Sequence, residues 1–128
     1  MIHYLLLSSG ITWVMLVLAA LLRTGATTPS GLKVAVGNRD NLPPPSALAA
    51  RADRAAKNML ENLVLFACVA LAASLAGADP ARASLGCQVF LFARIAYAVI
   101  YVAGIEWLRT LSWAAGVAGI AMVAVAAW

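Results

Sequence analysis

The stretch "RADRAAKNMLENLVLF", residues 51–66, changes character along its length. Its first half carries Arg51, Arg54 and Lys57 among alanines, whereas its last residues are continuously apolar. Glu61 and Asn62 lie where the change occurs. The stretch contains no proline or glycine to interrupt a helix. It therefore predicts one helix that begins in water and continues into a membrane.

The composition of the whole chain agrees with a membrane location. Of the 128 residues, 64% are hydrophobic and only 11% are charged, and the mean hydropathy is +0.91. Soluble domains carry about 25% charged residues, so an ordinary soluble domain is excluded. The net charge of +4 is too small and too localised to indicate a nucleic-acid partner. Cys68 and Cys87 both lie in apolar runs without metal-ligand spacing, so we expect buried thiols and no metal site.

Four apolar runs have about the 20 residues that a helix needs to cross a bilayer. A membrane-spanning backbone must satisfy its own hydrogen bonds, and the runs lack strand alternation, so helices are expected. The predicted spans are about 4–22, 47–77, 83–105 and 107–127, in one all-α membrane domain over residues 1–128. Three prolines exclude a helix through residues 43–45, and Ser46 is a good N-cap for the second of these helices, because its hydroxyl can accept a hydrogen bond from a backbone amide.

The loops between the spans predict the orientation in the membrane. Most basic residues lie between the first span and the apolar part of the second helix, which begins at Leu60: Arg23, Lys33, Arg39, Arg51, Arg54 and Lys57. The positive-inside rule therefore places the loop of about 23–46 in the cytoplasm and both termini outside. Glycine and proline in "TGATTPSG", residues 24–31, favour irregular chain in this loop.

Polar side chains form one stripe on each of two spans. Arg54, Asn58 and Glu61 share a face of the second helix, with Arg51 at its edge. On the third helix, Arg94, Tyr97 and Tyr101 also share a face. A charge in a membrane needs a partner, and Glu61 is the expected partner of Arg94. In the last span, Ala115, Gly116 and Gly119 indicate close helix packing.

Two arginines, a carboxylate, an amide and two phenols suit a small zwitterion with more than one carboxylate. Glutathione fits this description, although composition alone does not single it out among small anions. Arg109 lies at the start of the fourth span, where a cation near a bound thiol would favour the thiolate. The alternative is that Glu61 and Arg94 form a structural pair that fixes helix register.

Over residues 48–125 the chain resembles the MAPEG family, the membrane-associated proteins in eicosanoid and glutathione metabolism. The resemblance rests on R-x-x-x-N-x-x-E, here Arg54, Asn58 and Glu61, and on A-R-x-x-Y-x-x-x-Y in "VFLFARIAYAVIYVAGIEWLRT". It looks like a bacterial-type member. The resemblance implies a left-handed four-helix bundle that forms a homotrimer in lipid, in the bacterial inner membrane.

The resemblance also implies roles for individual residues. Glutathione would be the co-substrate, bound between subunits on the cytoplasmic side, while a lipophilic substrate enters from the membrane. Arg109 corresponds to the arginine that activates the thiol. The residues expected to hold glutathione, or to support those that do, are Arg51, Arg54, Lys57, Asn58, Glu61, Arg94, Tyr97 and Tyr101.

Three functions are compatible with four short spans. The leading hypothesis is a glutathione-dependent membrane transferase or peroxidase that acts on lipophilic electrophiles or hydroperoxides. The alternative is a non-catalytic MAPEG-like protein that binds lipid or a partner. A small multidrug transporter is disfavoured, because such proteins rely on an acidic residue in the first span, and "YLLLSSGITWVMLVLAALL", residues 4–22, has none.

Overall fold

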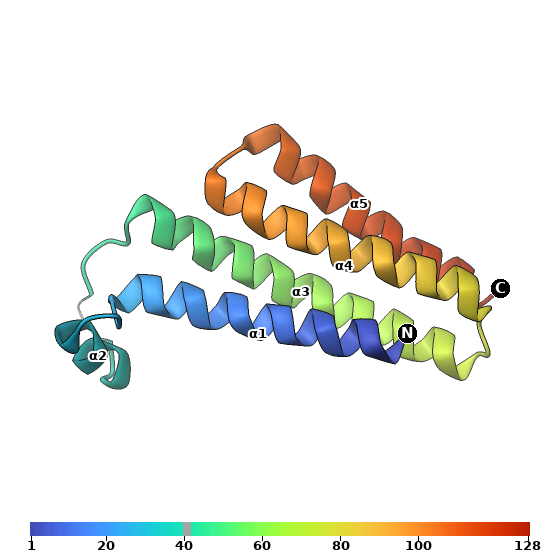
Figure 1. Ribbon diagram of the computed structural model, residues 1–128, viewed down its shortest axis with the longest axis horizontal. Coiled ribbons are helices and arrows are strands. Elements are labelled where there is room, and N and C mark those ends of the chain that lie inside the picture. The colour runs from blue at the N-terminus through green and yellow to red at the C-terminus, as the bar shows by residue number, and fades with distance from the viewer. Residues whose placement is uncertain (40–41) are drawn as a thin grey trace.

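The structure is a computed structural model that describes residues 1–39 and 42–128. Four long helices run antiparallel in chain order: α1 (Ile2–Thr24), α3 (Ala47–Leu75), α4 (Pro80–Ala103) and α5 (Glu106–Val125) (Figure 1). The described residues form helices and no strands. Each long helix is long and apolar enough to cross a membrane. The predicted all-α fold with four spans is confirmed.

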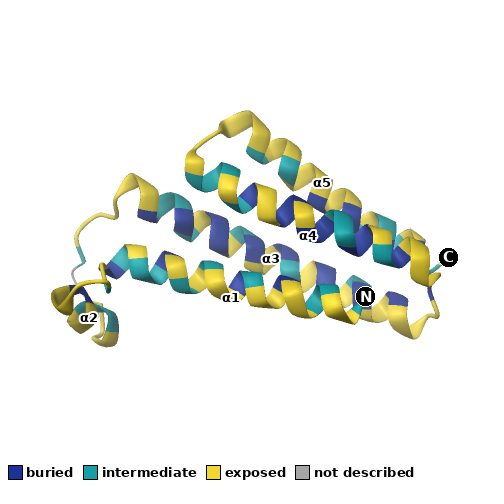
Figure 2. Cartoon of the chain, viewed as in Figure 1, coloured by how far each residue is buried: buried dark blue, intermediate teal, exposed yellow. Residues whose placement is uncertain are grey.

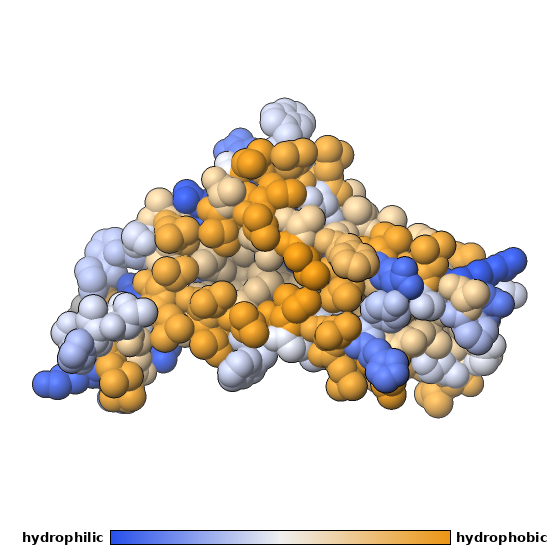
Figure 3. All heavy atoms as spheres, in the orientation of Figure 1, coloured by the Kyte–Doolittle hydropathy of each residue, from blue (hydrophilic) through white to orange (hydrophobic). Residues whose placement is uncertain are grey.

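The ends of the bundle differ in what they hold. The connection from α1 to α3 and the turn from α4 to α5 lie at one end, which we call the loop end (Figure 1). Both termini and the α3–α4 connection lie at the opposite end. Apolar side chains cover the middle of the molecule, and hydrophilic ones gather toward its two ends (Figure 3). This distribution suits a protein whose middle lies in hydrocarbon.

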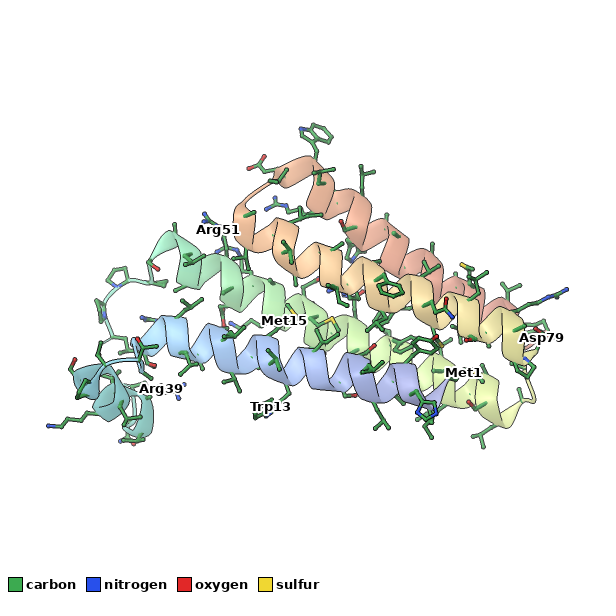
Figure 4. The ribbon with its side chains drawn as sticks, in the orientation of Figure 1. Met1, Trp13, Met15, Arg39, Arg51 and Asp79 are labelled. Carbon is green, nitrogen blue, oxygen red and sulfur yellow. The ribbon has the colours of Figure 1, made fainter. Side chains whose placement is uncertain are left out.

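Local sequence explains where α3 and α4 begin. The hydroxyl of Ser46 accepts a hydrogen bond from the amide of Ala49, as expected of an N-cap. Helix α3 has 29 residues, so at 1.5 Å per residue it is about 44 Å long and exceeds the bilayer. Helix α4 begins at Pro80 because Asp79 caps it by accepting a hydrogen bond from the amide of Arg82 (Figure 4).

One part of the loop prediction is wrong. The segment read as irregular contains a short helix, α2 (Pro29–Val36), beside the end of α1 (Figure 1). Thr28 caps this helix by accepting a hydrogen bond from the amide of Gly31, and Pro29 occupies its first turn, where its missing N–H costs nothing. A side chain at Gly31 would collide with the backbone of Gly25, so only glycine permits this close approach.

The core lies mainly along α3 and α4, which carry most of the buried residues (Figure 2). The rings of Phe66 and Phe90 stack there at a centroid distance of 4.0 Å. Cys87 is buried as predicted, whereas Cys68 is exposed, which corrects the expectation of two buried thiols. Cys68 differs because it lies on an outward face of α3, while Cys87 faces the core with Phe66 and Phe90.

Glycine brings α4 and α5 into close contact. Gly116 and Gly119 are buried in α5, whereas Ala115 is exposed, so close packing is confirmed for the two glycines and is wrong for the alanine. A Cβ atom built on Gly119 would lie 2.6 Å from the backbone nitrogen of Phe90 and 2.9 Å from the backbone oxygen of Gly86. The two backbones therefore pack without side chains between them.

Candidate functional site

Arginine and tyrosine side chains from three helices meet near the loop end of the bundle. Tyr101, on α4, is the centre of this group. Its hydroxyl accepts a hydrogen bond from Nε of Arg54, on α3, at 3.2 Å. From α5, Cζ of Arg109 lies 5.0 Å from the centroid of the Tyr101 ring, which is within cation–π range. One tyrosine thus connects two of the predicted site arginines.

Arg94 connects this group to the middle of α3. Its side chain is fully buried, and Nη2 donates a hydrogen bond to Oδ1 of Asn58 at 2.8 Å. Its Cζ lies 4.3 Å from the centroid of the Tyr97 ring, and the Tyr97 and Tyr101 rings are 5.3 Å apart. The polar faces that the sequence predicts on α3 and α4 therefore face each other.

The prediction that Arg94 pairs with Glu61 is wrong. Glu61 and Arg94, both of which the structure describes, form no ion pair, and Glu61 is exposed. Instead, Nε of Arg94 donates to Sδ of Met59 at 3.4 Å, beside the bond to Asn58. Asn58 and Glu61 share a face of α3, but Glu61 lies almost one helical turn further along the helix axis. The position of α4 along that axis places Arg94 level with Asn58.

Asn62 is a polar residue of the site that the predicted set omits. It is buried, and its Nδ2 donates to the backbone oxygen of Asn58 at 2.8 Å. The same nitrogen lies 3.4 Å from Oδ1 of Asn58, a longer contact. The signal was present in the sequence, since Asn62 follows Asn58 by four residues and so occupies the same helix face.

Arg51 and Lys57 have partners outside the tyrosine group. Nε of Arg51 donates at 2.9 Å to the backbone oxygen of Val102, in the last turn of α4, where carbonyls lack helical partners (Figure 4). Nζ of Lys57 lies 2.8 Å from Oδ2 of Asp53, one turn earlier on the surface of α3. Their assignment to a glutathione site stays a prediction, as it does for Glu61.

A pocket of about 230 Å³ opens beside the tyrosine group. It is lined by Tyr97, Tyr101, Arg109, Thr110 and Trp113. Of these, Thr110 and Trp113 were not in the set of site residues predicted from the sequence. Ligand pockets usually have at least about 300 Å³, so this pocket, in a single chain, accommodates only part of a ligand as large as a tripeptide.

An apolar groove of about 670 Å³ lies on a different face of α4. Helix α1 contributes Met15 and Leu18, α3 contributes Ala52, and α4 contributes Val99 and Val102, among other apolar residues. The periodicity of α4 turns Val99 and Val102 away from Tyr97 and Tyr101. The molecule therefore offers a polar pocket and a separate apolar groove.

Comparison with known proteins gives one match. The sequence matches the family model described as "MAPEG family" over residues 1–128, which is the whole chain. No curated protein and no solved structure matches the chain.

Proposed function

The chain belongs to the MAPEG family, and on that premise we propose that it is a glutathione-dependent transferase or peroxidase. Its four apolar helices and its family make it a multi-pass membrane protein. The observation that carries the proposal is Tyr101, which receives the hydrogen bond of Arg54 and lies under the guanidinium of Arg109, beside an open pocket. Second substrates would be lipophilic electrophiles or hydroperoxides dissolved in the bilayer.

In this proposal the polar residues bind different chemical groups of glutathione. Arg54, with its guanidinium beside Tyr101, takes a carboxylate, because guanidinium and carboxylate make strong, directional hydrogen bonds. Glu61, which is exposed on the same helix, takes the ammonium group. The hydroxyls of Tyr97 and Tyr101 bind the peptide groups, and Arg51 and Lys57 add positive charge at the rim.

Arg109 supplies the chemical step. Its guanidinium lines the pocket and lies against an aromatic ring, where it can stabilise a thiolate. The thiol proton leaves to water. The sulfur then attacks the electrophilic carbon and forms a thioether bond, while the bond to the leaving group breaks and that group departs with the bonding electrons. With a hydroperoxide, the sulfur attacks the terminal peroxide oxygen, the O–O bond breaks, and glutathione becomes a sulfenic acid. The alkoxide that leaves takes up a proton from water and is released as an alcohol. A second glutathione then reduces the sulfenic acid and yields glutathione disulfide and water.

The assembly and its place in the cell follow from the same proposal. A homotrimer would bring a neighbouring subunit to the pocket beside Tyr101, which is too small for a whole tripeptide. The loop end would face the cytoplasm of a bacterial cell, where glutathione is present, and both termini would lie outside. The left-handedness of the bundle stays a prediction, as do the homotrimer and the orientation in the membrane.

Glutathione binding to the detergent-purified protein tests the proposal. We expect saturable binding by calorimetry, weakened about 10-fold in Glu61→Gln, since a charge-assisted hydrogen bond contributes roughly that factor. Arg82→Gln, a change of an exposed charge at the opposite end of the bundle, is the matched control and should bind as the wild type does. A protein that binds no glutathione at millimolar concentration would refute the proposal.

The apolar groove between α1, α3 and α4 favours a second candidate, a non-catalytic protein that binds lipid. The groove is lined by apolar side chains and has room for a substantial part of an acyl chain. Lipid retained through purification, together with absent glutathione binding and absent turnover, would favour this candidate. Glutathione-dependent turnover that survives complete delipidation would instead favour the enzyme.

A further inference from the structure

Helix α2 is fixed against the end of a membrane span. Helix α1 has 23 residues and is about 35 Å long, so its last turn reaches the surface of a hydrocarbon layer about 30 Å thick. Residues 25–28 connect it to α2, and the amide of Thr28 donates to the backbone oxygen of Gly25 at 3.0 Å. A Cβ atom on Gly31 would collide with the backbone of Gly25, so α2 touches the end of α1. Helix α2 therefore lies at the surface of the membrane.

Helix α2 has three faces that differ in their surroundings. Among the described elements it packs only against α1. The face toward α1 consists of buried or half-buried residues, Gly31, Val34 and Ala35. Leu32 and Val36 lie about 40° apart on a second face, and 55% and 81% of their surfaces are exposed. Ser30 and Lys33 form a third, exposed face. An apolar face beside a basic one is typical of helices that lie in a membrane surface.

Two positive charges accompany the apolar face. Lys33 is exposed on α2 itself. Arg39 follows the helix, and its Nε and Nη2 donate to the backbone oxygen of Ala35 at 3.2 and 3.0 Å (Figure 4). These bonds hold the Arg39 charge against the last turn of α2. The whole segment of residues 23–46 has three basic residues and one acid, a net charge of +2. At a membrane surface such a segment attracts the phosphate groups of anionic lipids.

We propose that α2 is an interfacial helix that binds anionic phospholipid. Leu32 and Val36 lie among the outermost parts of the acyl chains, and Lys33 and Arg39 bind headgroup phosphates. Eight residues are too few for a helix to bind a membrane by itself. Helix α1 holds α2 at the surface, however, so the binding is intramolecular and needs few contacts. The inference does not depend on glutathione or on any turnover.

The depth of α2 in the bilayer is the first measurement. A nitroxide is attached to Val36→Cys on the apolar face, or to Ser30→Cys on the polar face as the matched control. Both variants carry Cys68→Ala, because Cys68 is exposed, whereas Cys87 is buried. In nanodiscs, we expect the ratio of accessibility to oxygen over accessibility to a water-soluble nickel chelate to be at least about 3-fold higher at position 36 than at position 30. Leu32→Cys repeats the measurement on the apolar face.

The preference for anionic lipid is measured with a fluorophore on Val36→Cys. Its quenching by brominated phosphatidylglycerol is compared with quenching by brominated phosphatidylcholine, in nanodiscs that contain a minor fraction of phosphatidylglycerol. We expect phosphatidylglycerol to be enriched beside α2. Lys33→Gln and Arg39→Gln should each lower this enrichment about 3- to 5-fold, since one basic residue near an anionic surface contributes roughly that factor. Arg82→Gln, at the opposite end of the bundle, should leave it unchanged.

The opposite results would overturn the inference. Equal accessibility ratios at positions 30 and 36 would show that α2 is surrounded by water. A label at position 36 that neither reagent reaches, in detergent as in nanodiscs, would assign the apolar face to a second copy of the chain instead of lipid. Equal quenching by the two lipids, or an enrichment that Lys33→Gln and Arg39→Gln leave intact, would refute the role of the charges. None of these readouts involves glutathione, so they are independent of the proposed function.

Discussion

Replacing Gly119 with alanine should destabilise the protein strongly, because the added methyl group has no room. Its Cβ would lie 2.6 Å from the backbone nitrogen of Phe90 and 2.9 Å from the backbone oxygen of Gly86. Backbone atoms cannot move aside as a side chain does, so α5 must shift away from α4. Overpacking of this kind costs about 1–3 kcal/mol. We expect the midpoint of thermal unfolding in detergent to fall by roughly 5–15 °C.

Gly10 provides the matched control for this prediction. It also lies inside a long helix, α1, but a Cβ atom built on it meets nothing within 4 Å. Gly10→Ala should therefore leave the midpoint unchanged or raise it, since alanine is the better helix former by about 1 kcal/mol. Equal midpoints for Gly119→Ala and Gly10→Ala would contradict the close crossing of α4 and α5.

The long helices are predictable because the information is local. A run of about 20 apolar residues predicts a membrane span, and the cap at Ser46 is predicted from a single residue. The short helix α2 carries an equally local signal, Thr28 followed by Pro29, which is typical of a helix start. The prediction of irregular chain gave more weight to the surrounding glycines than to this cap.

The partner of Arg94 could not be predicted in the same way. Helical periodicity places Asn58 and Glu61 on one face of α3, but it says nothing of how far α4 is displaced along that helix. The displacement depends on packing between distant residues, such as the stacked rings of Phe66 and Phe90. The rule that opposite charges pair favoured Glu61, whereas the packing placed Asn58 and Met59 beside the guanidinium.

Replacing Arg109 with leucine should abolish most glutathione-dependent turnover while leaving glutathione bound. The guanidinium lines the pocket and lies 5.0 Å from the Tyr101 ring centroid. In the proposed function, glutathione binding also draws on Arg54 and Glu61. Removing one group that stabilises a developing anion typically lowers the rate about 10²- to 10³-fold. We expect a loss in that range for model electrophiles or hydroperoxides, with less than a 10-fold change in the dissociation constant of glutathione.

Thiolate formation provides a direct measure of the step assigned to Arg109. With wild-type protein, ultraviolet absorbance of the thiolate should appear on addition of glutathione near neutral pH, because a nearby cation lowers the pKa of a thiol. Arg109→Leu should bind glutathione without that absorbance. Arg109→Lys keeps the positive charge without the planar guanidinium, so it should retain part of the absorbance and part of the turnover.

Arg54→Leu separates binding from activation in the same assays. Since Arg54 donates to the Tyr101 hydroxyl and is assigned to a carboxylate, its loss should raise the glutathione concentration needed for half-saturation. The thiolate should still form once glutathione is saturating. Full thiolate absorbance and full turnover in Arg109→Leu would contradict the role of Arg109 and would leave the arginine as a neighbour of Tyr101 with a packing function.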